Sequence, residues 1–79
     1  MKKCIIRLNS IDDVKEFCAA TNSCKFDVDV LSGRYAVDAK SIMGIFSLDL
    51  TKEVELVAHA DEAECEDLYD SIKRFIAEQ

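Results

Sequence analysis

The sequence contains no proline, no tryptophan, two glycines and one histidine among its 79 residues. Without proline, and with so little glycine, flexible linkers and low-complexity segments are excluded, and the loops between secondary-structure elements must be short. Basic residues are also scarce, because 10 Lys and Arg face 16 Asp and Glu for a formal net charge of −6. The sequence therefore lacks the basic stripe that a non-specific nucleic-acid-binding protein needs to contact phosphates.

Long hydrophobic runs are absent too. The longest apolar stretches fall far short of the roughly 18–20 residues that span a bilayer. Residues 1–3 lead directly into an alternating segment, not into the apolar region of a signal peptide. With 49% hydrophobic and 33% charged residues, the composition is that of a globular protein. We expect one soluble, cytoplasmic domain over residues 1–79, with neither a membrane nor a nucleic-acid partner.

Four cysteines, at positions 4, 18, 24 and 65, are many for so short a chain. None forms a Cys-x-x-Cys pair, and the single histidine, His59, is adjacent to none of them. Zinc sites require ligands that are closely paired in sequence. We therefore expect no metal and no cofactor, and we interpret the cysteines as reduced packing residues.

Alternation of apolar and polar residues predicts strands with one buried face. Four segments show this pattern: residues 3–8, 26–31, 34–38 and 53–58. Ser32 and Gly33 form a two-residue hairpin signal between the second and third strands. Lys3 and Arg7 on the first strand would complement Glu53 and Glu55 on the fourth, which favours pairing of these two strands.

Three segments show helical spacing. The first begins at Ser10, ends near Asn22–Ser23, and carries Asp13 at the capping-box distance from Ser10. Its predicted apolar face consists of Ile11, Val14, Phe17, Cys18 and Thr21. The second is a short helix over 41–48. The third begins at the N-cap Asp61, and its apolar stripe is Cys65, Leu68, Ile72, Phe75 and Ile76.

The predicted order is β-α-β-β-α-β-α, an α+β fold. Because every strand has one apolar face, all three helices should cover one side of a single antiparallel sheet. Parallel relations between strands joined through helices and right-handed crossovers would also fit this order. Periodicity alone leaves other two-layer α+β arrangements open.

The run Ala-Lys-Ser-Ile-Met-Gly at residues 39–44 resembles the HPr family, the histidine-containing phosphocarrier proteins of the bacterial sugar phosphotransferase system. The resemblance covers essentially the whole domain. It implies an open-faced β-sandwich whose four-stranded antiparallel sheet has the order 1-4-2-3, with three helices on one face. This order places the acidic second and fourth strands side by side, a conflict that costs only a fraction of a kcal/mol per exposed pair.

The sequence departs from the family where the phosphoacceptor histidine belongs. The family motif is Gly-Leu-His-Ala-Arg-Pro, whereas residues 9–14 read Asn-Ser-Ile-Asp-Asp-Val, with Ser10 near the place of the histidine. A serine phosphoester forms and transfers poorly, and Asp12 and Asp13 put negative charge where a phosphoryl group would sit. His59 should lie at the far end of the sheet, on the face away from the helices. We therefore expect no catalytic residue, no enzyme activity and no phosphohistidine relay.

Ser41 is the second candidate site. It stands at the predicted start of the second helix, where backbone amides are unpaired, and no acidic residue follows before Asp49. Phosphoserine would gain charge-assisted hydrogen bonds there. The resemblance implies that Ser41 is the target of an ATP-dependent regulatory kinase, whereas a plain helix cap is the alternative.

Apolar residues surround Ser41. The short second helix cannot bury all of its hydrophobic side chains, so we expect an exposed patch that docks proteins. By motif position, the resemblance implies that partners bind Lys40, Ile42, Met43 and Phe46. Core packing of at least half of these apolar residues is the alternative.

Three functional hypotheses follow. The first is an HPr-like, monomeric bacterial regulator that is controlled by phosphorylation of Ser41. By resemblance, its partners would be phosphotransferase-system components for sugar transport, an HPr-type kinase or a catabolite regulator. The second is a phosphocarrier with an unconventional acceptor, and the third is an unmodified adaptor domain.

Overall fold

Strands and helices follow one another in the predicted order, and two short elements extend that order at the carboxyl end. The computed structural model describes residues 2–78. In chain order the elements are β1 (Lys2–Ile6), α1 (Ile11–Asn22), β2 (Val28–Ser32), β3 (Tyr35–Asp38), α2 (Ile42–Phe46), β4 (Val54–Ala58), α3 (Glu62–Ser71), the 3₁₀ helix η1 (Lys73–Phe75) and β5 (Ile76–Glu78).

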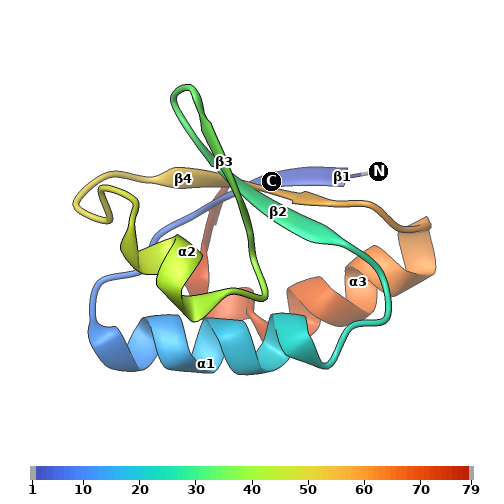
Figure 1. The fold of residues 1–79 in the computed structure, drawn as a ribbon. Helices are drawn as coiled ribbons and strands as arrows, with labels where there is room; N and C mark the ends of the chain where they lie inside the picture. Colours follow the sequence, from blue (N-terminus) through green and yellow to red (C-terminus); the bar gives the residue numbers. More distant parts are fainter. Residues whose placement is uncertain (1, 79) are drawn as a thin grey trace.

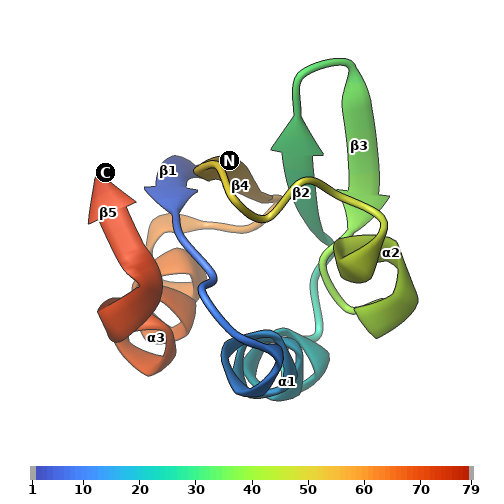
Figure 2. The same cartoon turned by 90° about the vertical axis from the view of Figure 1, so that its left-hand side faces the viewer.

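All strands join one antiparallel sheet of order β3-β2-β4-β1-β5. The three helices lie on one face of this sheet and leave the other face open (Figure 1, Figure 2). The predicted α+β open-faced sandwich and the order 1-4-2-3 of the first four strands are therefore confirmed. None of the helices within residues 2–78 has the length and apolar character to cross a bilayer.

The fifth strand corrects the prediction of four strands. We expected the last helix to carry Phe75 and Ile76 on its apolar stripe, but α3 ends at Ser71 and the chain turns through η1. The ring of Phe75 packs edge-on against Phe17 of α1, with centroids 6.5 Å apart. The amide of Arg7 donates to the carbonyl of Phe75 over 2.9 Å, and Ile76 pairs with β1. Apolar spacing could not separate a longer helix from a turn and a strand, because both bury these residues.

The predicted pairing of β1 with β4 is confirmed, and so are the expected contacts between their charged residues. Lys3 lies 3.9 Å from Glu55, and Arg7 lies 3.9 Å from Glu53, both across the open face. The expected conflict between β2 and β4 is relieved by register, because Glu55 is opposite an apolar residue, Leu31. Acidic residues on these two strands are thus not directly paired.

The core lies between the sheet and the helices. Val14, Phe17 and Cys18 of α1 are buried as predicted, and the buried hydroxyl of Thr21 donates to two backbone carbonyls. Ile11 was wrongly predicted to be buried, since 62% of it is exposed at the first position of α1. The four cysteines are free thiols, and only Cys24 is partly exposed.

Candidate functional site

Ser41 caps α2, as its sequence position predicts. Its side-chain oxygen accepts a hydrogen bond from the amide of Gly44 over 3.1 Å, and its carbonyl accepts one from the amide of Ile45 over 3.0 Å. The side chain is half-buried, neither sealed in the core nor fully exposed. The helix is shorter than the predicted 41–48, because the amide of Ser47 bonds to the carbonyls of Met43 and Gly44 and closes the last turn.

Gly44 leaves room beside the Ser41 hydroxyl. A Cβ added to this glycine would stand 3.3 Å from the Ser41 oxygen and 3.4 Å from the Cβ of Val37 on β3. The separation from the Ser41 oxygen is tighter than ordinary van der Waals contact, and the one from Val37 is at its lower limit. A larger residue here would therefore crowd the hydroxyl that forms the candidate site.

Lys40 is already engaged by the loop that follows α1. Its ammonium group donates to the carbonyl of Cys24 over 3.0 Å, while its own backbone carbonyl accepts from the side-chain amide of Asn22 over 2.9 Å. The carboxylate of Asp38 accepts a hydrogen bond from the backbone amide of Lys40 over 2.9 Å. These bonds hold the segment before Ser41 in place. Binding of a partner by Lys40 stays a prediction, and it would require the ammonium group to leave the carbonyl of Cys24.

The apolar side chains of α2 point in two directions. Ile45 is fully buried, whereas Met43 is 76% exposed, Phe46 41% and Ile42 36%. The three exposed residues, which we call the α2 surface, all lie within five positions of Ser41. The expectation of an exposed apolar patch is met at these three residues, and their role in binding remains a prediction.

A cleft of about 400 Å³ extends the α2 surface toward the start of α1. Its lining residues are Leu8, Asn9, Ser10, Ile11, Val14, Phe46, Leu50 and Thr51. Sequence reasoning missed Ile11 as a surface residue because it shares helical spacing with the buried Val14. Its position directly after the N-cap was the available signal, since the first turn of a helix extends past the layer it packs on. The candidate docking surface thus combines residues of α1 and α2.

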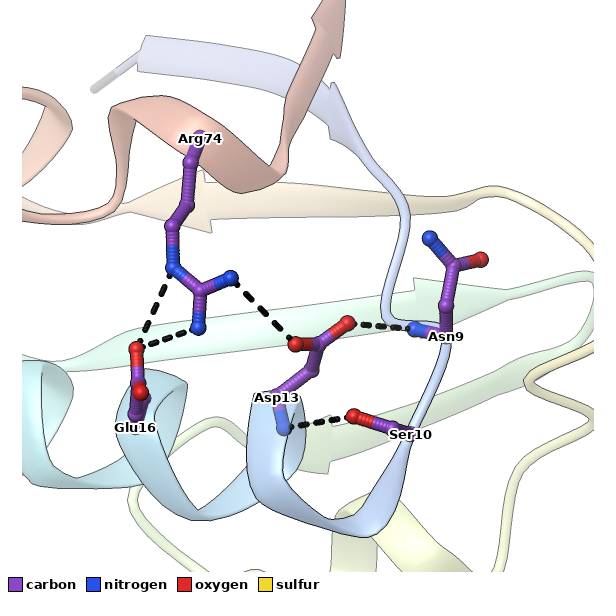
Figure 3. A network of polar contacts seen from close by, with 5 residues as sticks. All are labelled: Asn9, Ser10, Asp13, Glu16 and Arg74. Atoms are coloured by element: carbon purple, nitrogen blue, oxygen red, sulfur yellow. Dashed lines mark hydrogen bonds and ion pairs between the residues drawn. The ribbon is translucent and has the colours of Figure 1, made fainter.

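The start of α1 is closed by hydrogen bonds of its own (Figure 3). The side chain of Ser10 accepts from the amide of Asp13 over 3.1 Å, so the predicted N-cap is confirmed. The carboxylate of Asp13 reaches the amide of Asn9 over 2.9 Å, one residue earlier than a capping box requires. The Ser10 oxygen is therefore occupied as a hydrogen-bond acceptor by the helix it caps.

Arg74 of η1 joins this network from the other end of the chain (Figure 3). Its guanidinium lies 3.4 Å from the carboxylate of Asp13, and its Nε donates to Glu16 over 3.1 Å. The hydrogen bonds to Glu16 raise the pKa of Arg74, and the guanidinium stacks 4.2 Å from the ring centroid of Phe75. One of the two charges expected to repel phosphate is thus compensated, whereas Asp12 stays exposed. Nothing local in the sequence could have indicated this contact, because its partners are far apart in the chain.

His59 lies far from Ser10. The antiparallel register sets Ala58 beside Lys2, so His59 follows β4 at the end of the sheet where β1 begins, and Ser10 follows β1 at the other end. The His59 Nε2 is 2.8 Å from the carboxylate of Asp29. Within residues 2–78, no three histidine, cysteine or carboxylate side chains are grouped to hold a metal ion. His59 and Ser10, the two candidate acceptors for a phosphate relay, therefore lie at opposite ends of the sheet.

A family model described as "PTS HPr component phosphorylation site" matches residues 14–78. Among solved structures, HPr-C-His from Thermoanaerobacter tengcongensis is 28% identical over 92% of each chain, with a TM-score of 0.75. The Bacillus subtilis catabolite repression protein Crh, described as a swapped, intertwined dimer, is 26% identical over 87% of this chain and 84% of its own, with a TM-score of 0.64. The phosphocarrier protein HPr from Bacillus anthracis shares the fold with a TM-score of 0.70, at 20% identity over 94% of this chain and 95% of its own. Among curated proteins, none matches.

Proposed function

The chain belongs to the PTS HPr family, and from this we propose that it is a regulatory protein-binding module controlled by phosphorylation of Ser41. It acts in the bacterial cytoplasm, without enzyme activity and without carrying phosphate on a histidine. The observation that carries the proposal is the cap at Ser41, where a half-buried hydroxyl borders an exposed apolar surface.

The local chemistry at Ser41 supports a modification there. The first turn of α2 contains no acidic residue, so a phosphoryl group meets no carboxylate of its own turn. The amides of Ile42 and Met43 precede the first intrahelical hydrogen bond and are oriented toward the cap. A phosphoserine at this place gains donors without disturbing the core, since Ile45 is the buried residue of the helix.

The start of α1 supports loss of the relay. The matched residues begin at 14, after the segment in which the family carries its histidine. Ser10 is a poor replacement, because the exposed Asp12 in the first turn of α1 opposes a phosphoryl group there and a serine phosphoester would not pass the phosphoryl group on. His59 is held by Asp29 at the opposite end of the sheet.

The α2 surface supports a protein partner. Its Phe46 lines the 400 Å³ cleft together with Ile11 of α1, and Ile42 and Met43 are exposed apolar side chains on the same short helix. Because the protein carries a net charge of −6, it fits a partner whose apolar groove has a basic rim. A phosphorylated Ser41 would add charge at the edge of this contact and so change affinity for such a partner.

Intact-mass measurement after incubation with ATP and an HPr-type kinase tests the proposal. We expect the wild type and Ser10→Ala to gain the mass of one phosphate and Ser41→Ala to gain none. An unchanged wild-type mass favours the third hypothesis, an unmodified adaptor.

Incubation with phosphoenolpyruvate and the first enzyme of the phosphotransferase system tests the carrier alternative. We expect no label on the protein. Acid-labile label would instead establish a phosphocarrier, and its loss in His59→Ala or Ser10→Ala would identify the acceptor.

We also propose that the protein is a monomer in solution. Crh is described as a swapped dimer, so sedimentation over a range of protein concentrations is the direct measurement. A constant monomer mass is the expected result, and a stable dimer would contradict it.

A further inference from the structure

The three backbone amides of the turn that leads from β3 to Ser41 all donate hydrogen bonds. The amide of Ala39 donates to the carbonyl of Val28 on β2 over 2.8 Å. The amide of Ser41 donates to the carbonyl of Asp38 over 3.0 Å, and the carboxylate of Asp38 accepts from the amide of Lys40. Because these amides are satisfied within the sheet and the turn, the carbonyls of the turn need donors from another element.

The carboxyl end of α1 supplies these donors. The buried hydroxyl of Thr21 donates to the carbonyl of Ala39 over 2.7 Å. The side-chain amide of Asn22 donates to the carbonyl of Lys40 over 2.9 Å and to the carbonyl of Cys18, in its own helix, over 2.8 Å. Both partners of Asn22 are acceptors, which suits the two N–H donors of one amide nitrogen. The end of α1 thus holds the turn before Ser41.

Asn22 bonds to the peptide group directly before the candidate phosphorylation site. The carbonyl that it holds belongs to the Lys40–Ser41 peptide, and the amide of the same peptide bonds to Asp38. This rigid plane is therefore held at both of its polar ends, and its orientation determines the direction in which the Ser41 side chain leaves the backbone. Asn22 is itself exposed and lies 18 positions away in the sequence.

We infer that Asn22 is a positioning residue for the phosphorylation of Ser41, a role that rests on the proposed function. Phosphoryl transfer requires the acceptor oxygen in line with the leaving group, and a small misplacement of the acceptor lowers the rate strongly. Without the Asn22 side chain, the Lys40 carbonyl loses its donor and the peptide plane is free to rotate. The α2 surface follows Ser41 in the chain, so the loss should slow the transfer step and spare docking there.

Ser23 provides the matched control. It is the C-cap of α1, next to Asn22, and its hydroxyl donates to the carbonyl of Ala20 over 2.7 Å. Ser23→Ala therefore removes a hydrogen bond at the same helix end without releasing the carbonyl of Lys40. Ser23→Asp adds the same carboxylate as Asn22→Asp, one position further along the chain.

Steady-state phosphorylation of the full chain by an HPr-type kinase with ATP is the test. Asn22→Ala should lower kcat about fivefold, the factor that one hydrogen bond of ordinary net strength sets, and should leave the KM for the protein unchanged. Asn22→Asp should lower kcat further, because a carboxylate cannot donate to the Lys40 carbonyl. Both Ser23 variants should keep the kcat of the wild type.

Two readouts separate positioning from a loss of folding. A partly unfolded variant offers less substrate to the kinase, so it raises the apparent KM and leaves kcat unchanged. Hydrogen exchange of the Ser41 amide, which bonds to Asp38, should be faster in the two Asn22 variants than in the wild type and unchanged in the Ser23 variants. Circular dichroism verifies that all four variants are folded.

A wild type that gains no phosphate would overturn both the proposed function and the role of Asn22. With a phosphorylated wild type, three results would overturn the role of Asn22 alone. They are an unchanged kcat in both Asn22 variants, an equal loss of kcat in the Ser23 variants, or a change confined to KM.

Discussion

Ser10 and Ser41 have the same local geometry and different surroundings. Each caps a helix by accepting from the amide three residues on, in both cases over 3.1 Å. The turn after Ser10 contains Asp12 and Asp13, whereas the turn after Ser41 contains no acid. At the scale of single residues, the placement of carboxylates separates the start of α1 from the start of α2, where we propose that Ser41 is phosphorylated.

The two caps can be compared directly by substitution. Ser10→Ala and Ser41→Ala should each lower the free energy of unfolding by about 1 kcal/mol, because each leaves a helix amide without its acceptor. Urea unfolding measures both effects. If Ser41→Ala leaves stability unchanged, the cap at α2 contributes nothing, and the geometry has been misread.

Gly44 offers a second prediction at this scale. Gly44→Ala should slow phosphorylation of Ser41 by an HPr-type kinase, because the new methyl group presses on the Ser41 oxygen. Gly33→Ala is the matched control, since its φ of 59° strains the backbone but no atom lies within 4 Å of the added Cβ. Gly33→Ala should cost stability without changing the rate, and equal rates in both variants would contradict the steric explanation.

At the scale of elements, α2 divides its apolar residues between core and surface. Ile45 is fully buried and packs into the core cluster, while Met43 two positions earlier is 76% exposed. A five-residue helix turns these positions to opposite sides. The residue of this short helix that packs in the core therefore differs from the residues that we propose for recognition.

This division predicts different outcomes for two alanine substitutions. Ile45→Ala should lower the free energy of unfolding by about 2–5 kcal/mol through the cavity it leaves. Met43→Ala should change it by less than about 0.5 kcal/mol. Thermal unfolding followed by circular dichroism measures both, and comparable losses would show that the α2 surface serves packing.

The segment η1–β5 is held by two contacts of different kind. Phe75→Ala removes a buried ring and should cost about 3–5 kcal/mol. Arg74→Ala removes the exposed ion pairs with Asp13 and Glu16 and should cost much less than Phe75→Ala, an effect that salt reduces. Unfolding at low and high ionic strength separates them, and a salt-independent loss in Arg74→Ala would indicate packing on Phe75 instead.

At the scale of the whole molecule, the cysteines report on global unfolding. Burial raises the pKa of Cys4, Cys18 and Cys24, and raises that of the Tyr69 phenol as well. The folded state therefore holds these protons more tightly than the unfolded state does. These groups should not affect the free energy of unfolding at neutral pH. As the pH rises above the pKa of an ordinary thiol, they should lower the free energy of unfolding.

Thiol labelling and alkaline unfolding test this expectation together. A disulfide reagent at neutral pH should label Cys24 first, because it is the partly exposed thiol, and should reach the other cysteines at the unfolding rate. Cys24→Ser should abolish the fast phase. Stability that rises with pH in the alkaline range would contradict the assigned direction.

Some features follow from the sequence because neighbouring residues decide them. Alternation and helical spacing predicted the first four strands and the start of each helix. The caps at Ser10, Ser41 and Asp61 are also local, because each short polar side chain accepts from the backbone amide three residues on. The strand order required more than periodicity. Charge complementarity favoured the pairing of β1 with β4, and the family resemblance supplied the remaining neighbours.

Other features depend on the tertiary structure, in which residues distant in sequence come into contact. Whether Ile11 and Tyr35 are buried depends on how far the opposite layer extends, and no local pattern records that distance. The ion pairs of Arg74, the turn of the chain into β5 and the open edge at β3 arise from residues distant in sequence. Periodicity tells which apolar side chains share a face, whereas the packed layers determine which of them water still reaches.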